Sequence, residues 1–272
     1  MASCLDTALG HDFGLSAAPW LAQSAAFRIH HKGPSGRFFG WGDTYCDAQF
    51  DLNLLWLARR YQQPAAAAAA LRALSRSSES PFFGAAARGL INWSDGTGAE
   101  ALPLSTRFRG PEVAPVRTAW TADATWAGLK GGDVQAPHAH RDLGAVVIEA
   151  GGVRWIDDTG AGDYGDLRSW HGRPDSPGTR WEVFACAAEG HSSLLIDGRG
   201  CDLLSQMHLV PGSDLAVTSD SAFADRGVPQ WTRSLTRIED GVVDLVDTLK
   251  YRQPVQVQVQ WVTACTATTS DR

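Results

Sequence analysis

The sequence contains no run of about 18 apolar residues, the length that a transmembrane helix requires, so we expect no membrane span. Long clusters of basic residues are also absent: 24 Lys and Arg are scattered among 30 Asp and Glu, for a formal net charge of −6. Nucleic-acid binding depends on clustered positive charge, so this distribution excludes nucleic acid as the expected main partner. A local basic groove for an acidic substrate is compatible with it.

Cysteine is sparse as well, with five residues and no CxxC spacing. An odd number argues against a disulfide framework, and we expect buried free thiols. A bridge between Cys186 and Cys201 is the alternative if the protein is exported. The first ten residues have neither the basic start nor the apolar core of a signal peptide, and instead indicate the end of a helix closed by Gly10.

The first third of the chain has the pattern of helices. Residues 1–93 are predicted to be helical, with an apolar stripe over Thr44–Gln62 and a helix that begins at Pro64 and continues through six alanines. Ser80 could open another helix. The stretch 94–103 is rich in turn residues and is the predicted linker between two domains.

Residues 104–272 alternate with a period of two and predict antiparallel strands. Asp197 and Gly198 predict a hairpin turn. The fold class is therefore α+β, with helices followed by an antiparallel β domain. The last ten residues add no core to close the final edge, so we expect the sequence to be a piece of a longer protein. Strands are expected at 116–120, 145–149, 153–156, 193–197, 215–218, 234–238, 242–249 and 254–262.

Histidines and carboxylates form the most informative pattern. His138 and His140 lie two residues apart, Asp158 ends a later strand-like run, and His191 follows in Ala-Glu-Gly-His. Two imidazoles and a carboxylate can hold zinc with one position left open. Histidine pairs are common, however, and hydrogen-bonded structural histidines are the competing interpretation. Eleven tryptophans likewise indicate either core packing or platforms on which sugars stack.

These motifs resemble those of the heparinase II/III-like polysaccharide lyases. The resemblance rests on Gly128-Leu-Lys-Gly-Gly-Asp, His138-Ala-His-Arg-Asp-Leu-Gly, Arg154-Trp-Ile-Asp-Asp-Thr-Gly and Ala188-Glu-Gly-His-Ser-Ser-Leu-Leu-Ile-Asp-Gly. It implies that 1–93 is the end of an α/α toroid and 104–272 an antiparallel β-sandwich, with the substrate in a cleft between them. It also implies cleavage of acidic polysaccharides by β-elimination and a zinc ion, Zn(2+), of structural role.

By the same resemblance, His140, Asp158 and His191 match the metal ligands and His138 matches a histidine that faces the substrate. The family's catalytic tyrosine lies before the first helix of this chain, so we expect weak or no activity from the chain alone. Around His191 the family pattern also changes, to Ala185-Cys186 before it and Ser192-Ser193 after it. For a glycan-degrading lyase we expect a periplasmic or cell-envelope location. A homodimer would also fit this function.

Four further residues are candidates by their position beside these motifs. Tyr164 could face the cleft as a catalytic group, or pack as a loop aromatic. Arg141 and Arg168 could bind sugar carboxylates or sulfates, or be solvated surface charges. Asp142 could orient a metal-binding histidine, or cap a turn.

Two other functions compete with the lyase. One is a non-catalytic carbohydrate-binding module with a structural metal. The other is a zinc hydrolase that activates water, with Glu189 or Asp142 as the general base.

Overall fold

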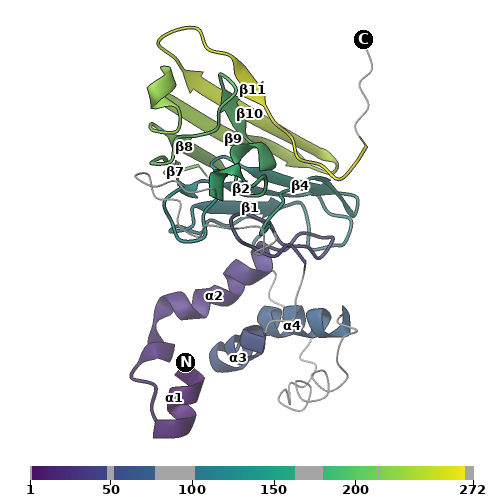
Figure 1. Cartoon of the computed structure of the whole chain (residues 1–272). Helices are drawn as coiled ribbons and strands as arrows, with labels where there is room; N and C mark the ends of the chain where they lie inside the picture. The colour runs from purple at the N-terminus through teal and green to yellow at the C-terminus, as the bar shows by residue number, and fades with distance from the viewer. Residues whose placement is uncertain (1, 48–51, 77–101, 163–179, 214, 267–272) are drawn as a thin grey trace. The chain divides into compact units, whose positions relative to one another are not determined.

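A computed structural model describes residues 2–47, 52–76, 102–162, 180–213 and 215–266 (Figure 1). Its contacts divide the chain into two compact units. The helical unit comprises Met1–His30 and Ala48–Pro103, and the β unit comprises His31–Asp47 and Leu104–Arg272. The predicted order of helices first and antiparallel β second is confirmed.

The helical unit begins with α1, Ala2–Leu9, which ends at Gly10 in the left-handed conformation (φ 75°), as predicted. A short 3-10 turn, Leu15–Ala17, leads into α2, Pro19–His30. The helices α3, Leu52–Tyr61, and α4, Pro64–Arg76, follow, and α4 begins at the predicted proline. The helix predicted over Thr44–Gln62 was too long at its start, and the helix predicted at Ser80 lies outside the described residues.

Alanine is the reason that α2, α3 and α4 can pack closely. Ala66, Ala67 and Ala70 of the alanine run are buried against the leucines of α3 and against Ala25 and Ile29 of α2. A side chain of one carbon allows two helix backbones to approach, so the run is a packed helix face. Two hydrogen bonds, from Gln63 to the carbonyl of Ala22 and from Tyr61 to that of Ser16, add polar links within the unit.

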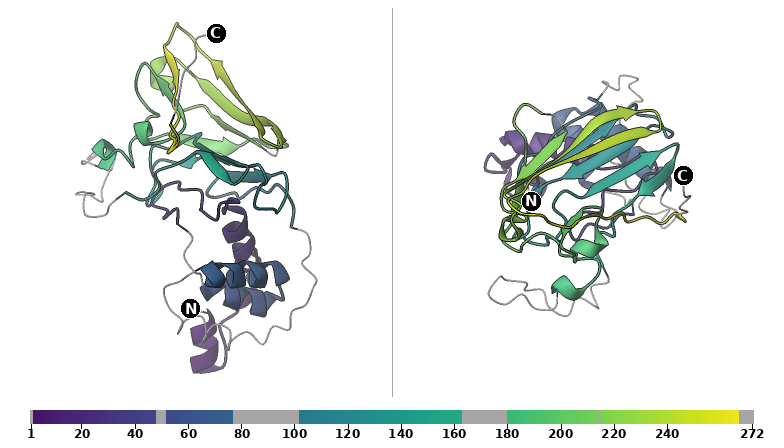
Figure 2. Two further views of the ribbon diagram at one scale, coloured as in Figure 1. Left: turned by 90° about the vertical axis from the view of Figure 1, so that its right-hand side faces the viewer. Right: turned by 90° about the horizontal axis from the view of Figure 1, so that it is seen from above.

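The β unit is a sandwich of antiparallel sheets (Figure 2). One sheet has the order β1-β2-β4-β5, the second β10-β9-β8-β7-β3, and β11 pairs with β6. The strands are β1 Val113–Arg117, β2 Trp126–Lys130, β3 Gly132–Asp133, β4 Val146–Ala150, β5 Val153–Ile156, β6 Leu194–Ile196, β7 Gln206–Leu209, β8 Ala216–Ser219, β9 Gln230–Glu239, β10 Val242–Lys250 and β11 Val257–Val259.

The core between the sheets contains aliphatic side chains and two large aromatics, Phe223 and Trp231, whose rings lie 5.3 Å apart. Trp231 packs directly on Gly144, where a Cβ would come within 2.3 Å of the indole. Gly144 also has a φ of 70°, so both space and backbone conformation require glycine there. This contact fixes the start of β4 close to the loop that carries Asp142.

The opposite face of the first sheet is covered by the segment His31–Asp47. Phe39 of this segment packs against Val113, Trp126 and Val147, and a Cβ on Gly128 would meet its ring at 2.6 Å. The predicted boundary placed this segment with the helices. The structure places it in the β unit because β1 and β2 are apolar on both faces and need a second cover.

Buried charges fasten the same segment to the sheet. Arg154 donates to the carboxylate of Glu149 at 2.6 Å and to the carbonyls of Arg37 and Phe38 at 2.9 and 2.8 Å. Glu149 also accepts hydrogen bonds from the backbone and hydroxyl of Ser35, each 2.8 Å long. Each charged group therefore has its partners, as burial requires.

Most predicted strands are confirmed within a few residues, and the Asp197-Gly198 turn is confirmed by positive φ at both residues and by the Ile196–Arg199 bridge. The strands β2, β3 and β7 were not predicted. All five cysteines fall in the described residues and are free, but only Cys186 and Cys201 are buried as expected, whereas Cys4 is exposed. Among the described helices, none is both long and apolar enough to cross a bilayer.

The charge network yields a stability prediction. Replacing Arg154 with Met removes the cation that pairs with the buried Glu149 carboxylate, which then keeps its hydrogen bonds from Ser35, and takes away one donor to the Phe38 carbonyl. We expect this loss of a buried charge partner to cost roughly 3–5 kcal/mol. Denaturant unfolding followed by tryptophan fluorescence measures this loss. The matched control is Arg237→Met, which removes an exposed ion pair with Asp244 and should leave the unfolding midpoint nearly unchanged. Equal midpoints in the two variants would contradict this role of Arg154.

Candidate functional site

The site is organised by Asp43, at the end of the loop Gly40-Trp-Gly-Asp. Its carboxylate is 3% exposed and contacts three cations or potential cations. One oxygen accepts from His138 Nδ1 at 2.8 Å, and the other lies 2.9 Å from His140 Nε2 and 3.0 Å from Arg180 Nη2. Burial would raise the pKa of Asp43, but the hydrogen bonds from His140 and His138, together with Arg180, outweigh it and hold the pKa well below its usual range.

His138 is held in an unusual conformation. Its φ is 62°, which a residue other than glycine adopts at a cost. The strain is supported by a reciprocal contact, because the Asp43 N–H donates to the His138 carbonyl at 3.1 Å while the Asp43 carboxylate accepts from the imidazole. The imidazole is 57% exposed. His138 is therefore a fixed histidine that presents its ring to solvent.

Two fully buried histidines, His140 and His191, lie behind it with ring centroids 5.3 Å apart. Each has a carboxylate on one nitrogen: Asp43 on His140 Nε2 and Asp158 on His191 Nδ1, at 2.9 Å in both cases. The remaining nitrogens, His140 Nδ1 and His191 Nε2, are buried without a hydrogen-bond partner among the described residues.

The carboxylates determine which nitrogen carries the proton. A carboxylate only accepts, so the nitrogen that faces it carries the hydrogen when the imidazole is neutral. The lone pairs then lie on the two unpartnered nitrogens of His140 and His191. A carboxylate behind each imidazole and an unpaired lone pair in front of it is the arrangement found around metal-binding histidines.

The third predicted ligand, Asp158, lies beside His191, and both of its carboxylate oxygens already accept hydrogen bonds. One of its oxygens accepts from His191 and the other from the Gly160 N–H at 3.1 Å. In this arrangement Asp158 orients His191. That Asp158 itself binds a metal stays a prediction.

A different set of potential ligands converges within the described residues: the donor atoms of Asp43, His140 and Cys186 lie within 4.8 Å of one another. Two features disfavour a cation there. Arg180 already pairs with Asp43, and burial raises the pKa of the Cys186 thiol to about 11. We therefore favour the lone pairs of His140 and His191.

Asp142 has partners other than the one predicted. Its carboxylate is fully buried and accepts from Lys130 Nζ at 2.8 Å and from the Gly42 N–H at 3.0 Å. Burial would raise the pKa of Asp142, but the Lys130 charge outweighs it and the pKa is lowered. Its support of the histidines is thus indirect, since it fixes the loop that carries Asp43.

The remaining predicted residues divide into one that the structure places and two that it does not. Arg141 is half-buried and donates from Nε and Nη2 to the carbonyl of Cys201, so it is no freely solvated charge. Tyr164 and Arg168 lie outside the described residues.

Sequence reasoning missed Asp43, Arg180 and Cys186. A signal for Asp43 was present in its glycines. At Gly40 a Cβ would meet the Cys46 sulfur at 2.3 Å, and at Gly42 it would meet the His138 carbonyl oxygen at 2.8 Å. Glycine pairs before a carboxylate often mark such close backbone approaches. Arg180, which also donates to the Ala139 carbonyl at 3.1 Å, had no comparable signal.

The comparisons with known proteins bear on this geometry. A family model described as Heparinase II/III-like, C-terminal, matches residues 117–271. The chain belongs to this family. Comparison with curated proteins finds no match.

Solved structures share the fold of this heparinase II/III-like chain. A mutant of the heparan sulfate lyase HepC from Pedobacter heparinus matches with a TM-score of 0.57 and 15% identity, over 87% of this chain and 33% of that one. A heparinase III gene product matches with a TM-score of 0.62 and 14% identity, over 91% and 35%. The chain thus spans about one third of the length of these structures. The family relates it to polysaccharide lyases, and the partial toroid followed by a sandwich is confirmed.

The carboxylate contacts predict histidine tautomers that NMR can measure. At neutral pH we expect the proton of His138 on Nδ1 and those of His140 and His191 on the nitrogens that face their carboxylates. In Asp43→Asn the preference of His138 and His140 should weaken, while that of His191 persists. Side-chain nitrogen chemical shifts report this. The control is Asp133→Asn, whose carboxylate accepts from Gln135 and Gln206. Identical shifts in both variants would contradict the role of Asp43.

Proposed function

We propose that the chain is the C-terminal part of a polysaccharide lyase that cleaves uronic-acid-containing glycans by β-elimination. The observation that carries the proposal is His138, an exposed imidazole locked in position by Asp43, in a chain of the heparinase II/III-like family. Two of the similar structures are a heparan sulfate lyase and a heparinase III, and acidic glycans are the substrate class we infer from them.

The elimination needs one proton removed and one supplied. The base takes the hydrogen of C5, the electron pair of that C–H bond forms a C4–C5 double bond, and the C4–O bond breaks. The leaving oxygen then receives a proton. His138 suits one of these transfers, because Asp43 fixes its Nδ1–H and leaves the lone pair on Nε2. The chain's second proton-transfer group is not among the residues described around His138.

The buried charges around His138 are paired, so they do not oppose an anionic substrate. Arg180 contacts the Asp43 carboxylate and the Ala139 carbonyl, so a cation lies directly behind the histidine loop. Lys130 is likewise buried against Asp142. Because these cations balance the buried carboxylates, the site has no net negative charge that would repel the uronate carboxylate. That carboxylate must be neutralised as negative charge develops at C5.

We also propose that His140 and His191 hold a zinc ion on their unpartnered nitrogens. The fit rests on the two buried lone pairs and on Asp43 and Asp158, which orient the rings. A structural zinc takes four ligands, so an ion bound there would need others beside the two histidines, of which Asp158 is the predicted one. It would cross-link the loops before β4 and before β6. It would then fix His140, and through the shared Asp43 carboxylate also His138.

An absorbance assay tests the lyase. A longer protein that contains this chain should release unsaturated uronate, which absorbs in the near ultraviolet, from heparan-like or alginate-like chains. His138→Ala should lower this rate by roughly 10²–10⁴-fold, the usual contribution of a proton-transfer residue. We expect little or no turnover by the 272-residue chain alone.

The control is His208→Ala, an exposed histidine of β7 whose loss should leave the rate unchanged. Saturated products would indicate a hydrolase in place of a lyase. Glycan binding without any product would indicate a carbohydrate-binding module. A periplasmic or cell-envelope location stays a prediction, which fractionation of the native host would test.

Metal content tests the zinc site without reference to activity. The purified chain should contain about one zinc, and a chelator should lower its melting temperature by several degrees, since a ligand at 100 times its Kd adds about 2.7 kcal/mol. His140→Ala and His191→Ala should lose the metal, whereas His208→Ala retains it. Cobalt substitution distinguishes the sites: a thiolate charge-transfer band would show that Cys186 is a ligand and contradict the assignment to the two histidines.

A further inference from the structure

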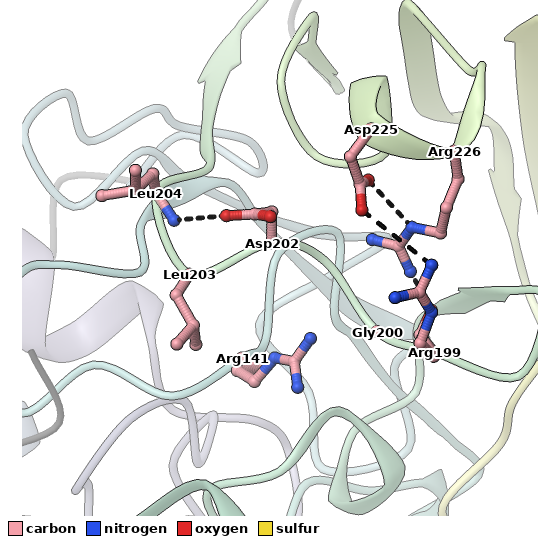
Figure 3. Close-up of a pocket in the computed structure, with 8 residues that line it drawn as sticks. All are labelled: Arg141, Arg199, Gly200, Asp202, Leu203, Leu204, Asp225 and Arg226. Atoms are coloured by element: carbon pink, nitrogen blue, oxygen red, sulfur yellow. Dashed lines mark hydrogen bonds and ion pairs between the residues drawn. The ribbon is translucent and has the colours of Figure 1, made fainter. Parts of the chain in front are cut away.

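A pocket of about 340 Å³ opens beside Arg141, three residues after His138 (Figure 3). It combines three guanidinium groups with two carboxylates and two leucine side chains. The proposed lyase chemistry does not use it. Its lining residues are Arg141, Arg199, Gly200, Asp202, Leu203, Leu204, Asp225 and Arg226.

Two of the arginines are fixed in place. Arg141 donates from Nε and Nη2 to the Cys201 carbonyl, and among the described residues no group bonds to its Nη1. Arg226 is buried and donates to the carbonyls of Arg199 and Ala222 and to the carboxylate of Asp225. Arg226 is therefore a fixed part of the pocket wall, whereas Nη1 of Arg141 can donate to a ligand.

Arg199 is the adaptable member. Its side chain is 65% exposed, and its Nη2 lies 4.0 Å from Asp225, the outer limit of an ion pair. Such a loose pair contributes little and gives way when a better acceptor arrives. It sits directly after the Asp197-Gly198 turn, which fixes its backbone.

Gly200 allows the pocket wall to pack on the turn that precedes His191. A Cβ at this position would come within 2.0 Å of the Ala188 Cβ, whereas its 3.6 Å separation from Arg141 Nη2 is an ordinary contact. A larger residue would therefore displace Ala188. The glycine thus connects the geometry of the pocket with the segment that carries His191.

The chemistry of the walls fits an acidic saccharide better than a bare ion. Guanidinium groups bind carboxylates and sulfates through charge-assisted hydrogen bonds. One oxygen of Asp202 caps the Leu204 N–H at 3.0 Å, and its second oxygen can accept from a sugar hydroxyl. Leu203 and the exposed Leu204 offer an apolar wall for the C–H face of a ring.

We propose that this pocket is an anion subsite of the glycan-binding surface, in which Arg141 and Arg199 bind a carboxylate or sulfate of the sugar chain. The proposal rests on the proposed function, since it assumes an acidic glycan. It adds a binding site to that function: residues of the β6 turn and of the loop before β7 would hold an acidic sugar unit.

Calorimetric titration of the 272-residue chain with uronate oligosaccharides, with and without sulfate esters, tests the subsite. We expect Arg199→Ala to weaken binding roughly tenfold, which corresponds to loss of one charge-assisted hydrogen bond, and Arg199→Lys to restore part of it. The matched control, Arg237→Ala, also removes an exposed arginine that pairs with an aspartate, but on β9. Melting curves verify that all variants are folded.

Each outcome bears on one proposal. Equal affinity of Arg199→Ala and Arg237→Ala, or no binding by the wild-type chain, overturns the subsite and leaves the lyase assay to judge the function. A selective loss of binding in Arg199→Ala, together with no unsaturated product from any glycan in the assay of the longer protein, supports the subsite and refutes the lyase. A loss confined to sulfated ligands identifies the sulfate as the bound group, whereas an equal loss with both ligands identifies the carboxylate.

Discussion

The β unit depends on buried charges that are fully paired across a long sequence separation. Arg154 and Glu149 hold the backbone of residues 35–38, and Lys130 and Asp142 hold that of Gly42. Removing one partner of such a network leaves the other charged in a low-dielectric interior, which costs far more than an exposed pair contributes. The network therefore fixes the segment His31–Asp47 on the sheet in a single register, and every contact of Asp43 follows from that register.

Asp43 lies on this fixed segment, and its hydrogen bonds determine how the histidine rings are oriented. One carboxylate contacts an exposed imidazole, His138, and a buried one, His140, so the orientation of each depends on the other. Arg180 completes the charge balance and allows the carboxylate to stay ionised although it is buried. The same arrangement recurs at His191 with Asp158. The proposed proton-transfer group and the proposed metal site thus share one framework, in which a disturbance of either His138 or His140 reaches the other through Asp43.

Local sequence patterns predicted the strands whose two faces differ in burial, and the turns and helix ends marked by glycine or proline. The first six residues of β9 alternate between part-buried and buried positions, and β10 alternates between part-buried and exposed ones. Gly10 and Pro64 mark helix ends and Asp197-Gly198 makes its turn, all as predicted. The strand β2 was missed because Trp126–Lys130 is buried at every position and has no alternation to detect. The segment with Phe39 was assigned to the helical half because its contacts are more than 70 residues distant in sequence, for example with Trp126.

By itself the sequence determined the order of helices and antiparallel strands and the family, and it singled out His138, His140, Asp158 and His191 as candidates, because short motifs and periodicity are local properties. Only the tertiary structure decided what surrounds each of these side chains. Asp43 contacts both His138 and His140, and Asp142 pairs with Lys130. One pocket is lined by Arg141, Arg199 and Arg226. Those partners come from segments that are distant in sequence and come into contact only when the sheets pack and the loops form ion pairs. Local sequence patterns do not predict such contacts.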